Sequence, residues 1–514
     1  MGNETMTDTT HDTGASPVIT FLNDAAGTNE KARLSGRMGA GSLMLTVLAF
    51  SAPIAVVEGF IPFAILFGGP GASFAFALTT LLLLVFSVGY VTMARHVPKP
   101  GDFYAFISSG LGNVMGLGAA FLAVVSYLAV LGGTYIFLGV SVNSLFESMG
   151  GVQTTWWMWS IIGWVLVSTL GYFHIELSAR ILAIAMIIEV AVVMIFNVAV
   201  LLVGGSEGLS SAPFTPSAFA SGDMAVTMLY AILVFMGFEA TALFRDEVRD
   251  PDKTIPRATY GAVIFVGALY TLSCYALTSA FGSQAWEVAK NDPSTMFGIA
   301  IGKFVAPVFE QIAYFSVVLS VTAALISIHN VLSRYVLNLA VDKALPTGLA
   351  KVHERHSSPH LASNAVAIAA AVFLAPFIIM NSDGSVLYAI ATGIGSVGVI
   401  SLMAMVSAAV IAWFGRHGIP KGENAFKVFI APLVAAIAMV LTVIYAVAHL
   451  DLVVGGAPGE NLWLVYFLLA AFLIGSFLAL YFRTAKPEVY TNLGRADRVF
   501  EFLAQKREQA TNKH

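Results

Sequence analysis

Three carboxylates, Glu58, Glu189 and Glu239, lie inside stretches that are otherwise apolar enough to sit in a lipid bilayer. An ionised carboxylate at the bilayer centre costs roughly 2.5 to 3.5 kcal/mol on insertion scales, so a residue of this kind is usually kept for a task or neutralised. The chemistry open to these side chains is pairing with an amine, binding of a proton, or a structural hydrogen bond. Each is therefore a candidate functional residue.

Two of these carboxylates follow an interruption of an apolar run. In the first run the sequence Ser-Ala-Pro at 51–53 precedes Glu58, and in the sixth run Gly237 precedes Glu239. Proline removes a backbone donor and breaks the helical hydrogen-bond ladder. Interruptions in two corresponding helices point to a substrate site near the middle of the membrane, because unwound backbone offers hydrogen-bond donors and acceptors there.

The composition says what kind of chain must position these residues. Of 514 residues, 58% are hydrophobic and 11% are charged, and the mean hydropathy is +0.82. These values are far from those of a soluble domain and predict a polytopic membrane protein. The net charge of -4 gives no reason to expect a nucleic-acid partner. The single cysteine, Cys274, excludes an intrachain disulfide and a cysteine-based metal cluster.

Apolar runs of about twenty residues are expected to span the membrane as helices. We predict an all-α polytopic membrane protein with twelve such helices. The third and eighth runs are long, which indicates tilt or helix extending beyond the bilayer. The twelve runs are 43–67, 73–95, 103–145, 156–173, 178–203, 223–244, 256–281, 304–339, 362–380, 386–413, 429–449 and 462–482.

The predicted domain organisation follows from these runs. Residues 1–40 are expected to form a disordered cytoplasmic tail, 41–413 a transport core of ten helices, 414–483 two further helices, and 484–514 a cytoplasmic C-terminal tail. With the N-terminus inside, Lys290 and Lys303 are the only Lys or Arg residues in external loops. Because cationic residues accumulate in cytoplasmic loops, this asymmetry predicts a plasma-membrane protein with both termini in the cytoplasm.

The first and sixth runs, which carry the interruptions, are five helices apart. This spacing is expected if helices one to five and six to ten are two copies of one unit. An odd number of helices per copy forces the two copies to be inverted in the membrane. The repeat is inferred from the placement of the interruptions.

Several motifs resemble the signatures of a known transporter family. They lie at 100–104 (Pro-Gly-Asp-Phe-Tyr), 110–112 (Gly-Leu-Gly), 235–258, 333–335 (Ser-Arg-Tyr) and 342–346 (Asp-Lys-Ala-Leu-Pro). Together they resemble the amino acid-polyamine-organocation (APC) superfamily over residues from about 43 to 482. The resemblance implies the LeuT-like 5+5 inverted repeat, broken helices one and six, two additional helices, and alternating access to a central site.

The resemblance implies substrate-binding residues at both interruptions. The family's first helix generally carries a Gly-Ser-Gly type stretch, which this chain lacks, so a mere kink remains an alternative there. Aromatic residues on the sixth helix resemble the family's lid over the substrate, although helix packing would also explain them. The predicted substrate-binding residues are Ser51, Ala52, Pro53, Ile54, Ala55, Val57, Glu58, Ser126, Tyr127, Phe235, Gly237, Phe238 and Ser396.

A second set of residues is predicted to couple or gate transport. Glu189 lies at a family position that often holds a lysine in sodium-independent members; a carboxylate there could instead bind a proton or help hold a cation, or be silently paired. Glu239 falls on the family's Gly-Phe-Glu motif, which belongs to a gate or to a helix-anchoring network. Arg245 and Glu247 begin a charge run that is either part of a cytoplasmic gate or a solvated loop.

The predicted function is import of an amino acid or a related amine by a secondary transporter, coupled to protons or to sodium. A polyamine or amine carrier or exchanger is the alternative that Glu58 favours, and a transporter-like nutrient sensor is a weaker one. The sequence contains no HExxH, nucleophile elbow or phosphate loop, so no enzyme activity and no cofactor are expected. The oligomeric state is left open.

Overall fold

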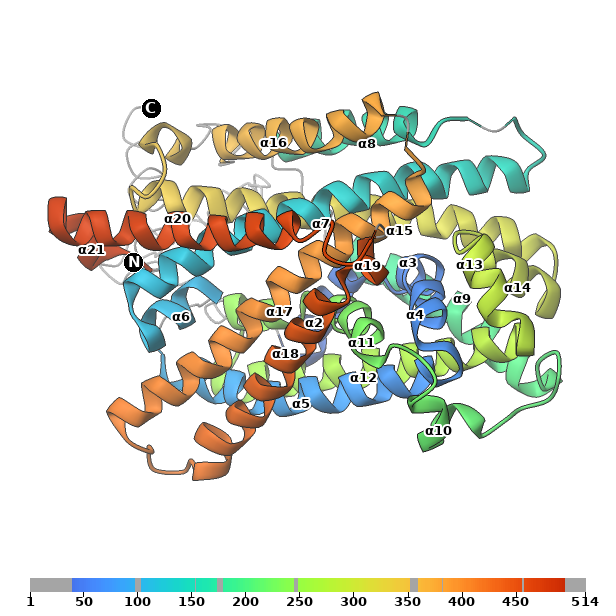
Figure 1. Ribbon diagram of the computed structural model, residues 1–514, viewed down its shortest axis with the longest axis horizontal. Coiled ribbons are helices and arrows are strands. Elements are labelled where there is room, and N and C mark those ends of the chain that lie inside the picture. Colours follow the sequence, from blue (N-terminus) through green and yellow to red (C-terminus); the bar gives the residue numbers. More distant parts are fainter. Residues whose placement is uncertain are drawn as a thin grey trace, which may run out of the picture.

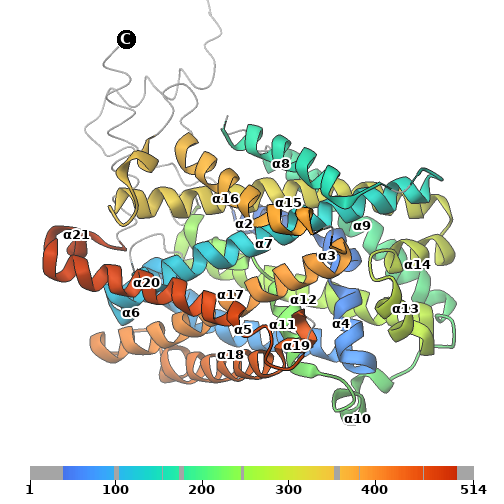
Figure 2. The same cartoon turned by 45° about the horizontal axis from the view of Figure 1, so that its top comes forward.

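The computed structural model describes residues 39–97, 103–152, 154–172, 179–244, 248–351, 359–380, 382–454 and 457–494. In this part of the chain the long elements are all helices, packed side by side in one bundle (Figures 1 and 2). Nine helical stretches of the described residues are long and apolar enough to cross a membrane. The protein is therefore a multi-pass membrane protein.

The nine stretches include ten of the twelve predicted runs, because Pro53–His96 contains the second run and most of the first. The first run is continuous with the second, the fourth forms a helix of 17 residues, and the sixth is divided by a break. The nine stretches are Pro53–His96, Asn113–Ser148, Ile184–Val203, Pro251–Asn291, Val308–Val341, His360–Ile379, Gly384–His417, Phe426–Ala448 and Trp463–Ala485.

The first predicted helix is interrupted at Ala52. It consists of α2 (Ala40–Ser51), α3 (Pro53–Gly59) and α4 (Ile61–Gly68). Ala52 has φ 47° and ψ 67°, in the left-handed region that a non-glycine residue rarely occupies. Pro53 takes the first position of α3, where its missing N–H costs no helical hydrogen bond.

The sixth predicted helix is interrupted at residues 234–237, directly after its first half. It consists of α11 (Met224–Leu233), a turn at 234–237, and the 3-10 helix η3 (Phe238–Phe244). Gly237 has φ 108°, which only glycine adopts without strain. The helix that follows, α12 (Pro251–Phe281), begins five residues earlier than predicted, so Pro251 takes its first turn and Pro256 lies inside it.

The third and eighth predicted runs contain the longest helices. The third run is divided into α6 (Phe103–Leu111) and α7 (Asn113–Ser148), because Gly112 has φ 92°. The eighth run forms α15 (Val308–Val341), which begins four residues later than predicted, directly after Pro307; the separate helix α14 (Met296–Phe304) precedes it. Unlike the interruptions at Ala52 and Gly237, the division at Gly112 falls near the end of a long helix.

The remaining helices surround the interrupted pair. α7 and α17 cross through the bundle against each other, and α15 packs against α7 (Figure 1). The other helices are α5 (Ala72–His96), α8 (Trp156–Tyr172), α9 (Ala179–Val203), α10 (Pro216–Phe219), α13 (Ala285–Asn291), α16 (His360–Ile379), α17 (Gly384–His417), α18 (Ala431–Ala448), α19 (Leu450–Val454), α20 (Trp463–Ala485) and α21 (Pro487–Asn492).

The outer face of α18 is apolar and uncovered. Leu433, Ile437, Leu441 and Ile444 recur at three- and four-residue spacing, and the side chains are each more than half exposed. Side chains at this spacing share one face of a helix. An apolar stripe on a helix of a multi-pass protein is the surface that contacts lipid.

Close packing of α7 against α8 yields a test of the fold. A Cβ added at Gly139 would meet the carbonyl oxygen of Trp156 at 2.1 Å and the Ser160 hydroxyl at 2.7 Å. Because the first of these is backbone, a helix must shift, and we expect Gly139→Ala to destabilise the protein by about 1–3 kcal/mol.

The matched control is Gly415→Ala, since a Cβ at Gly415 in α17 meets nothing within 4 Å. Alanine is a better helix former than glycine by about 1 kcal/mol, so this substitution should leave the thermal midpoint unchanged or raise it. The measurement is the melting temperature of each purified variant. Equal midpoints for the two variants would contradict the close α7–α8 contact.

Candidate functional site

The two interrupted helices meet at their breaks. The Ser51 hydroxyl, at the end of α2, donates to the carbonyl oxygen of Val234 at 3.2 Å, directly after α11. The same hydroxyl lies 2.6 Å from the Tyr270 hydroxyl of α12, which also donates to the Ser51 carbonyl oxygen at 3.4 Å. The last carbonyls of a helix have no partner within it. These hydroxyls therefore satisfy both helix ends and hold them together.

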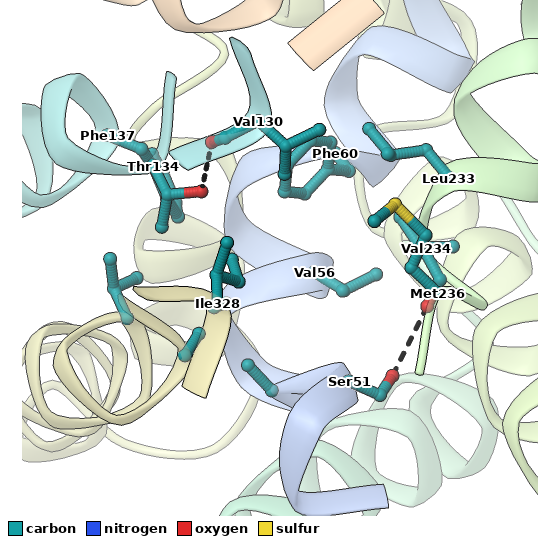
Figure 3. A pocket seen from close by; sticks show the side chains of 14 residues that line it. Ser51, Val56, Phe60, Val130, Thr134, Phe137, Leu233, Val234, Met236 and Ile328 are labelled. Atoms are coloured by element: carbon teal, nitrogen blue, oxygen red, sulfur yellow. Dashed lines mark hydrogen bonds between the residues drawn. The ribbon is translucent and has the colours of Figure 1, made fainter. Parts of the chain in front are cut away.

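A cavity of about 80 Å³ lies beside this junction. In this conformation it has room for on the order of five water molecules. Figure 3 shows Ser51 and Val234 at one side of the cavity and Phe60, Val130 and Thr134 at another. The lining residues are Ser51, Ala52, Ala55, Val56, Phe60, Val130, Thr134, Phe137, Leu233, Val234, Met236, Val321, Ala324 and Ile328.

The cavity wall is mostly apolar and has no charged side chain among its lining residues. Its side-chain polar groups are the hydroxyls of Ser51 and Thr134; the Thr134 hydroxyl donates to the Val130 carbonyl at 2.7 Å. Ala52 and Ala55 bring backbone from either side of the first break to the wall. The last carbonyls of α2 and the first N–H groups of α3 have no partners within their helices, because they lie at helix ends. The arrangement suits a small ligand that both donates and accepts hydrogen bonds.

An aromatic cluster closes one side of the cavity. The rings of Phe60 and Phe137 lie 6.2 Å apart, and each packs against Tyr388, at 6.3 and 4.8 Å. The Tyr388 hydroxyl donates to the Gly59 carbonyl at 2.9 Å. A Cβ at Gly59 would meet the Phe137 ring at 2.4 Å, so glycine permits this approach. Large rigid rings at this position can separate the cavity from solvent.

Glu239 is anchored at the second break. Its carboxylate accepts hydrogen bonds from the Gly237 backbone N–H at 2.9 Å and from the Tyr127 hydroxyl at 3.1 Å. The Tyr90 hydroxyl donates to the Glu239 carbonyl oxygen. The unwound turn is thus tied to α7 through Tyr127 and to α5 through Tyr90.

Glu189 joins three helices at the first break. On α9, its side chain is 8% exposed and accepts a hydrogen bond from the Ser320 hydroxyl of α15 at 2.8 Å. The backbone N–H of Ile54, in the first turn of α3, also points to this carboxylate. Such an N–H group in the first turn of a helix has no partner within the helix. Glu189 thus lies between α3, α9 and α15.

Glu58 is buried without hydrogen bonds. It lies on α3, is 1% exposed, and neither carboxylate oxygen has a partner in hydrogen-bonding geometry. The backbone of Gly298 in α14 is directed toward it, and Asp292 and Glu310 are its charged neighbours. Glu58 is absent from the cavity lining. Its side chain faces α14 and α15, away from the junction of the two breaks.

The other residues predicted as substrate-binding are buried around the site. Phe235 packs edge-on against Tyr270 at 6.3 Å, and Phe238 against Phe86 at 6.0 Å. The hydroxyls of Ser126 and Ser396 donate to carbonyls of their own helices at 2.7 Å. Of the predicted set, Ser51, Ala52 and Ala55 line the cavity. Arg245 and Glu247 lie outside the described residues.

Most residues of the cavity wall were not predicted from the sequence. Val130, Thr134 and Phe137 on α7, and Val321, Ala324 and Ile328 on α15, recur at spacings of three and four residues. Such spacing predicts one helix face, but it does not say whether that face meets another helix or a cavity. Pro53, Ile54 and Val57 are buried and do not line it.

Comparison with known proteins places this architecture in a family. The family model described as "Amino acid permease" matches residues 40–491. The branched-chain amino acid permease BcaP of Bacillus subtilis is 23% identical over 311 residues, which cover 57% of this chain and 65% of that protein. The chloroplastic cationic amino acid transporter 7 of Arabidopsis thaliana is 26% identical, over 67% of this chain and 60% of that protein.

A mammalian relative gives a similar result. The Asc-type amino acid transporter 1 of Mus musculus is 25% identical, over 53% of this chain and 52% of that protein. This chain therefore spans between about half and two thirds of the lengths of these three relatives. The family model extends further, from the start of α2 to the last turn of α21. The chain belongs to the amino acid permease family of the APC superfamily.

Proposed function

We propose that the protein is a secondary transporter that moves a small neutral amino acid across the plasma membrane by alternating access. The observation that carries this proposal is the cavity at the junction of the two broken helices, bridged by Ser51 and Val234. Backbone at a helix break lacks regular helical partners and can serve the amino and carboxylate groups of an amino acid. The names of these three relatives, which are all amino acid carriers, support an amino acid as the substrate; one of them is named for cationic amino acids.

The uncharged wall favours a neutral side chain over a cationic one. A buried charge is costly unless it is paired, and the lining residues offer no carboxylate to a second amino group. Glu58, which had favoured an amine carrier, is directed toward α14 instead. The inverted repeat, twelve spans and cytoplasmic termini belong to the same proposal and follow from the family's architecture and the charge distribution.

Glu189 is the proposed proton-binding residue. Burial of a carboxylate disfavours its charged form, and Glu189 contacts α3 and α15 across the first break. Coupling requires that the proton bind one conformation better than another, since equal affinity shifts no equilibrium. A carboxylate at a junction of three helices meets this requirement when those helices move relative to one another.

A thermal-shift screen tests the substrate class. Purified protein is heated with neutral amino acids, with lysine and arginine, and with putrescine. A ligand present at 100 times its Kd stabilises the folded state by about 2.7 kcal/mol, so we expect upward shifts with neutral amino acids, followed by their saturable uptake into proteoliposomes. A shift with putrescine alone, or displacement of labelled amino acid by putrescine, would support the amine-carrier alternative.

Ser51→Ala tests the junction of the breaks. The change removes the hydroxyl that donates to Val234 and lines the cavity. A hydrogen bond is worth about 0.5–1.5 kcal/mol, so we expect KM for uptake to rise by roughly 2- to 10-fold. The control is Ser401→Ala, whose hydroxyl donates only to Val397 within its own helix at 2.7 Å. Equal KM values for the two variants would count against the site.

Glu189→Gln tests the coupling. The amide can still accept the hydrogen bond from Ser320 but cannot take up a proton, so uptake should persist down a substrate gradient and lose its acceleration by an inward proton gradient. Glu287→Gln, at an exposed position on α13, is the control for loss of one charge. If a proton gradient still accelerates uptake by the Glu189→Gln variant as much as by the unmodified protein, Glu189 is excluded as the proton site.

A further inference from the structure

The geometry points to an internal clasp: the segment 487–494 after the last long helix binds α6 and the end of α15, and thereby positions the turn that carries Glu239. α21 and the residues that follow it lie at the same end of the bundle as α6 (Figures 1 and 2). This inference rests on the proposed function for its consequence in transport, but the clasp itself is defined by contacts that do not depend on the substrate.

The polar centre of the clasp is a buried carboxylate. Asp342, at the end of α15, is 4% exposed and accepts a hydrogen bond from the Tyr104 hydroxyl of α6 at 2.9 Å. The backbone N–H of Gly494 is shared between that hydroxyl, at 2.7 Å, and the Asp342 carboxylate, at 3.1 Å. Three segments far apart in the sequence thus converge on one carboxylate. Hydrogen bonds to an ionised group are stronger than those between neutral groups.

Shape complementarity at Gly494 makes the contact specific. Gly494 has φ 72°, and a Cβ there would lie 2.7 Å from both Cβ and Oγ of Ser108 on α6. Leu493 is 3% exposed and packs with Tyr104 in a small apolar cluster separate from the main core. The Asn113 side-chain amide donates to the Tyr490 carbonyl at 2.6 Å. A segment that merely lay on the surface would not bury a leucine or require a glycine.

The opposite face of α6 contacts Tyr90 of α5, which supports the second break of the candidate site. Tyr104 and Ser108 are one turn apart on the clasp side, while Phe106 packs edge-on against Tyr90 at 5.2 Å. The Tyr90 hydroxyl in turn donates to the Glu239 carbonyl. Displacing α6 therefore disturbs the support of the second break without touching the cavity.

α6 is also fixed at its far end. The Arg416 guanidinium of α17 donates to the Gly110 carbonyl, and a Cβ at Gly110 would meet the Ala409 carbonyl oxygen at 2.3 Å. Release of the clasp would leave this second attachment in place. The expected effect is a tilt or loosening of α6 about its end at Gly110, not loss of the helix from the bundle.

The test uses Gly494→Ala and Tyr104→Phe in the full chain. Alanine at 494 is strained and collides with Ser108, whereas phenylalanine at 104 keeps the ring and removes the shared hydroxyl. Gly422→Ala is the matched control, because Gly422 has φ 93° with nothing within 4 Å of a Cβ. Hydrogen exchange measured by mass spectrometry should become faster in peptides covering 103–111 and 487–494 in both clasp variants, and not in the control.

A second measurement reports access to the cavity and needs no substrate. In a Cys274→Ala background, Thr134→Cys places one thiol at the cavity wall, and its rate of reaction with a maleimide reports access to the cavity. Residues along a coupled network shift a two-state equilibrium by about 0.5–2 kcal/mol, so the clasp variants should change the labelling rate by roughly 2- to 30-fold.

The outcomes separate the clasp from the proposed function. Faster exchange in 103–111 together with an altered labelling rate supports the clasp. Faster exchange with an unchanged labelling rate overturns its positioning role, and unchanged exchange in both variants overturns the clasp itself. Absence of amino acid uptake in the unmodified protein would contradict the proposed function while leaving these two readouts interpretable.

Discussion

The structure depends on how unwound backbone is satisfied inside the membrane. Lipid offers no hydrogen bonds, so irregular backbone at this depth persists only where protein groups or a cavity supply partners. At the first break the hydroxyls of Ser51 and Tyr270 serve both helix ends. At the second break the Glu239 carboxylate accepts from the Gly237 N–H. Each break therefore has side-chain partners in place of a continuous helix, and Ser51, Ala52 and Ala55 at the first break line the cavity.

The same constraint explains why the surrounding helices pack so closely. α7 approaches α8 at Gly139 and α17 approaches α6 at Gly110, where a side chain would collide with backbone carbonyls. Close helix packing through small residues replaces the hydrophobic driving force that lipid does not provide between helices. The interrupted helices are therefore held in a tightly packed frame.

Sequence reasoning located the breaks better than it located the cavity. Pro53 and Gly237 carry a backbone constraint that can be read without a structure, so the interruptions were predicted within a residue or two. The division at Gly112 was missed, since a single glycine in an apolar run also occurs in continuous helices.

Wall residues such as Val321 and Ile328 have the same types and spacing as core residues. Only the relative rotation of α7, α15 and the broken pair, which is fixed by packing over long sequence distances, decides which apolar face borders the cavity. The direction of the Glu58 side chain also could not be predicted from the sequence. Its position on the first helix was predicted correctly, but its direction toward α14 depends on a contact about 240 residues away.

The three membrane carboxylates differ in their partners. Glu239 accepts hydrogen bonds from Gly237, two residues away, and from Tyr127 on α7. Glu58 has no hydrogen-bond partner and faces α14. Glu189 accepts a hydrogen bond from Ser320 on α15, and the backbone N–H of Ile54 on α3 points toward it. Of the three, Glu189 is therefore the carboxylate that lies between α15 and the broken first helix, and this position is the reason for proposing it as the proton site.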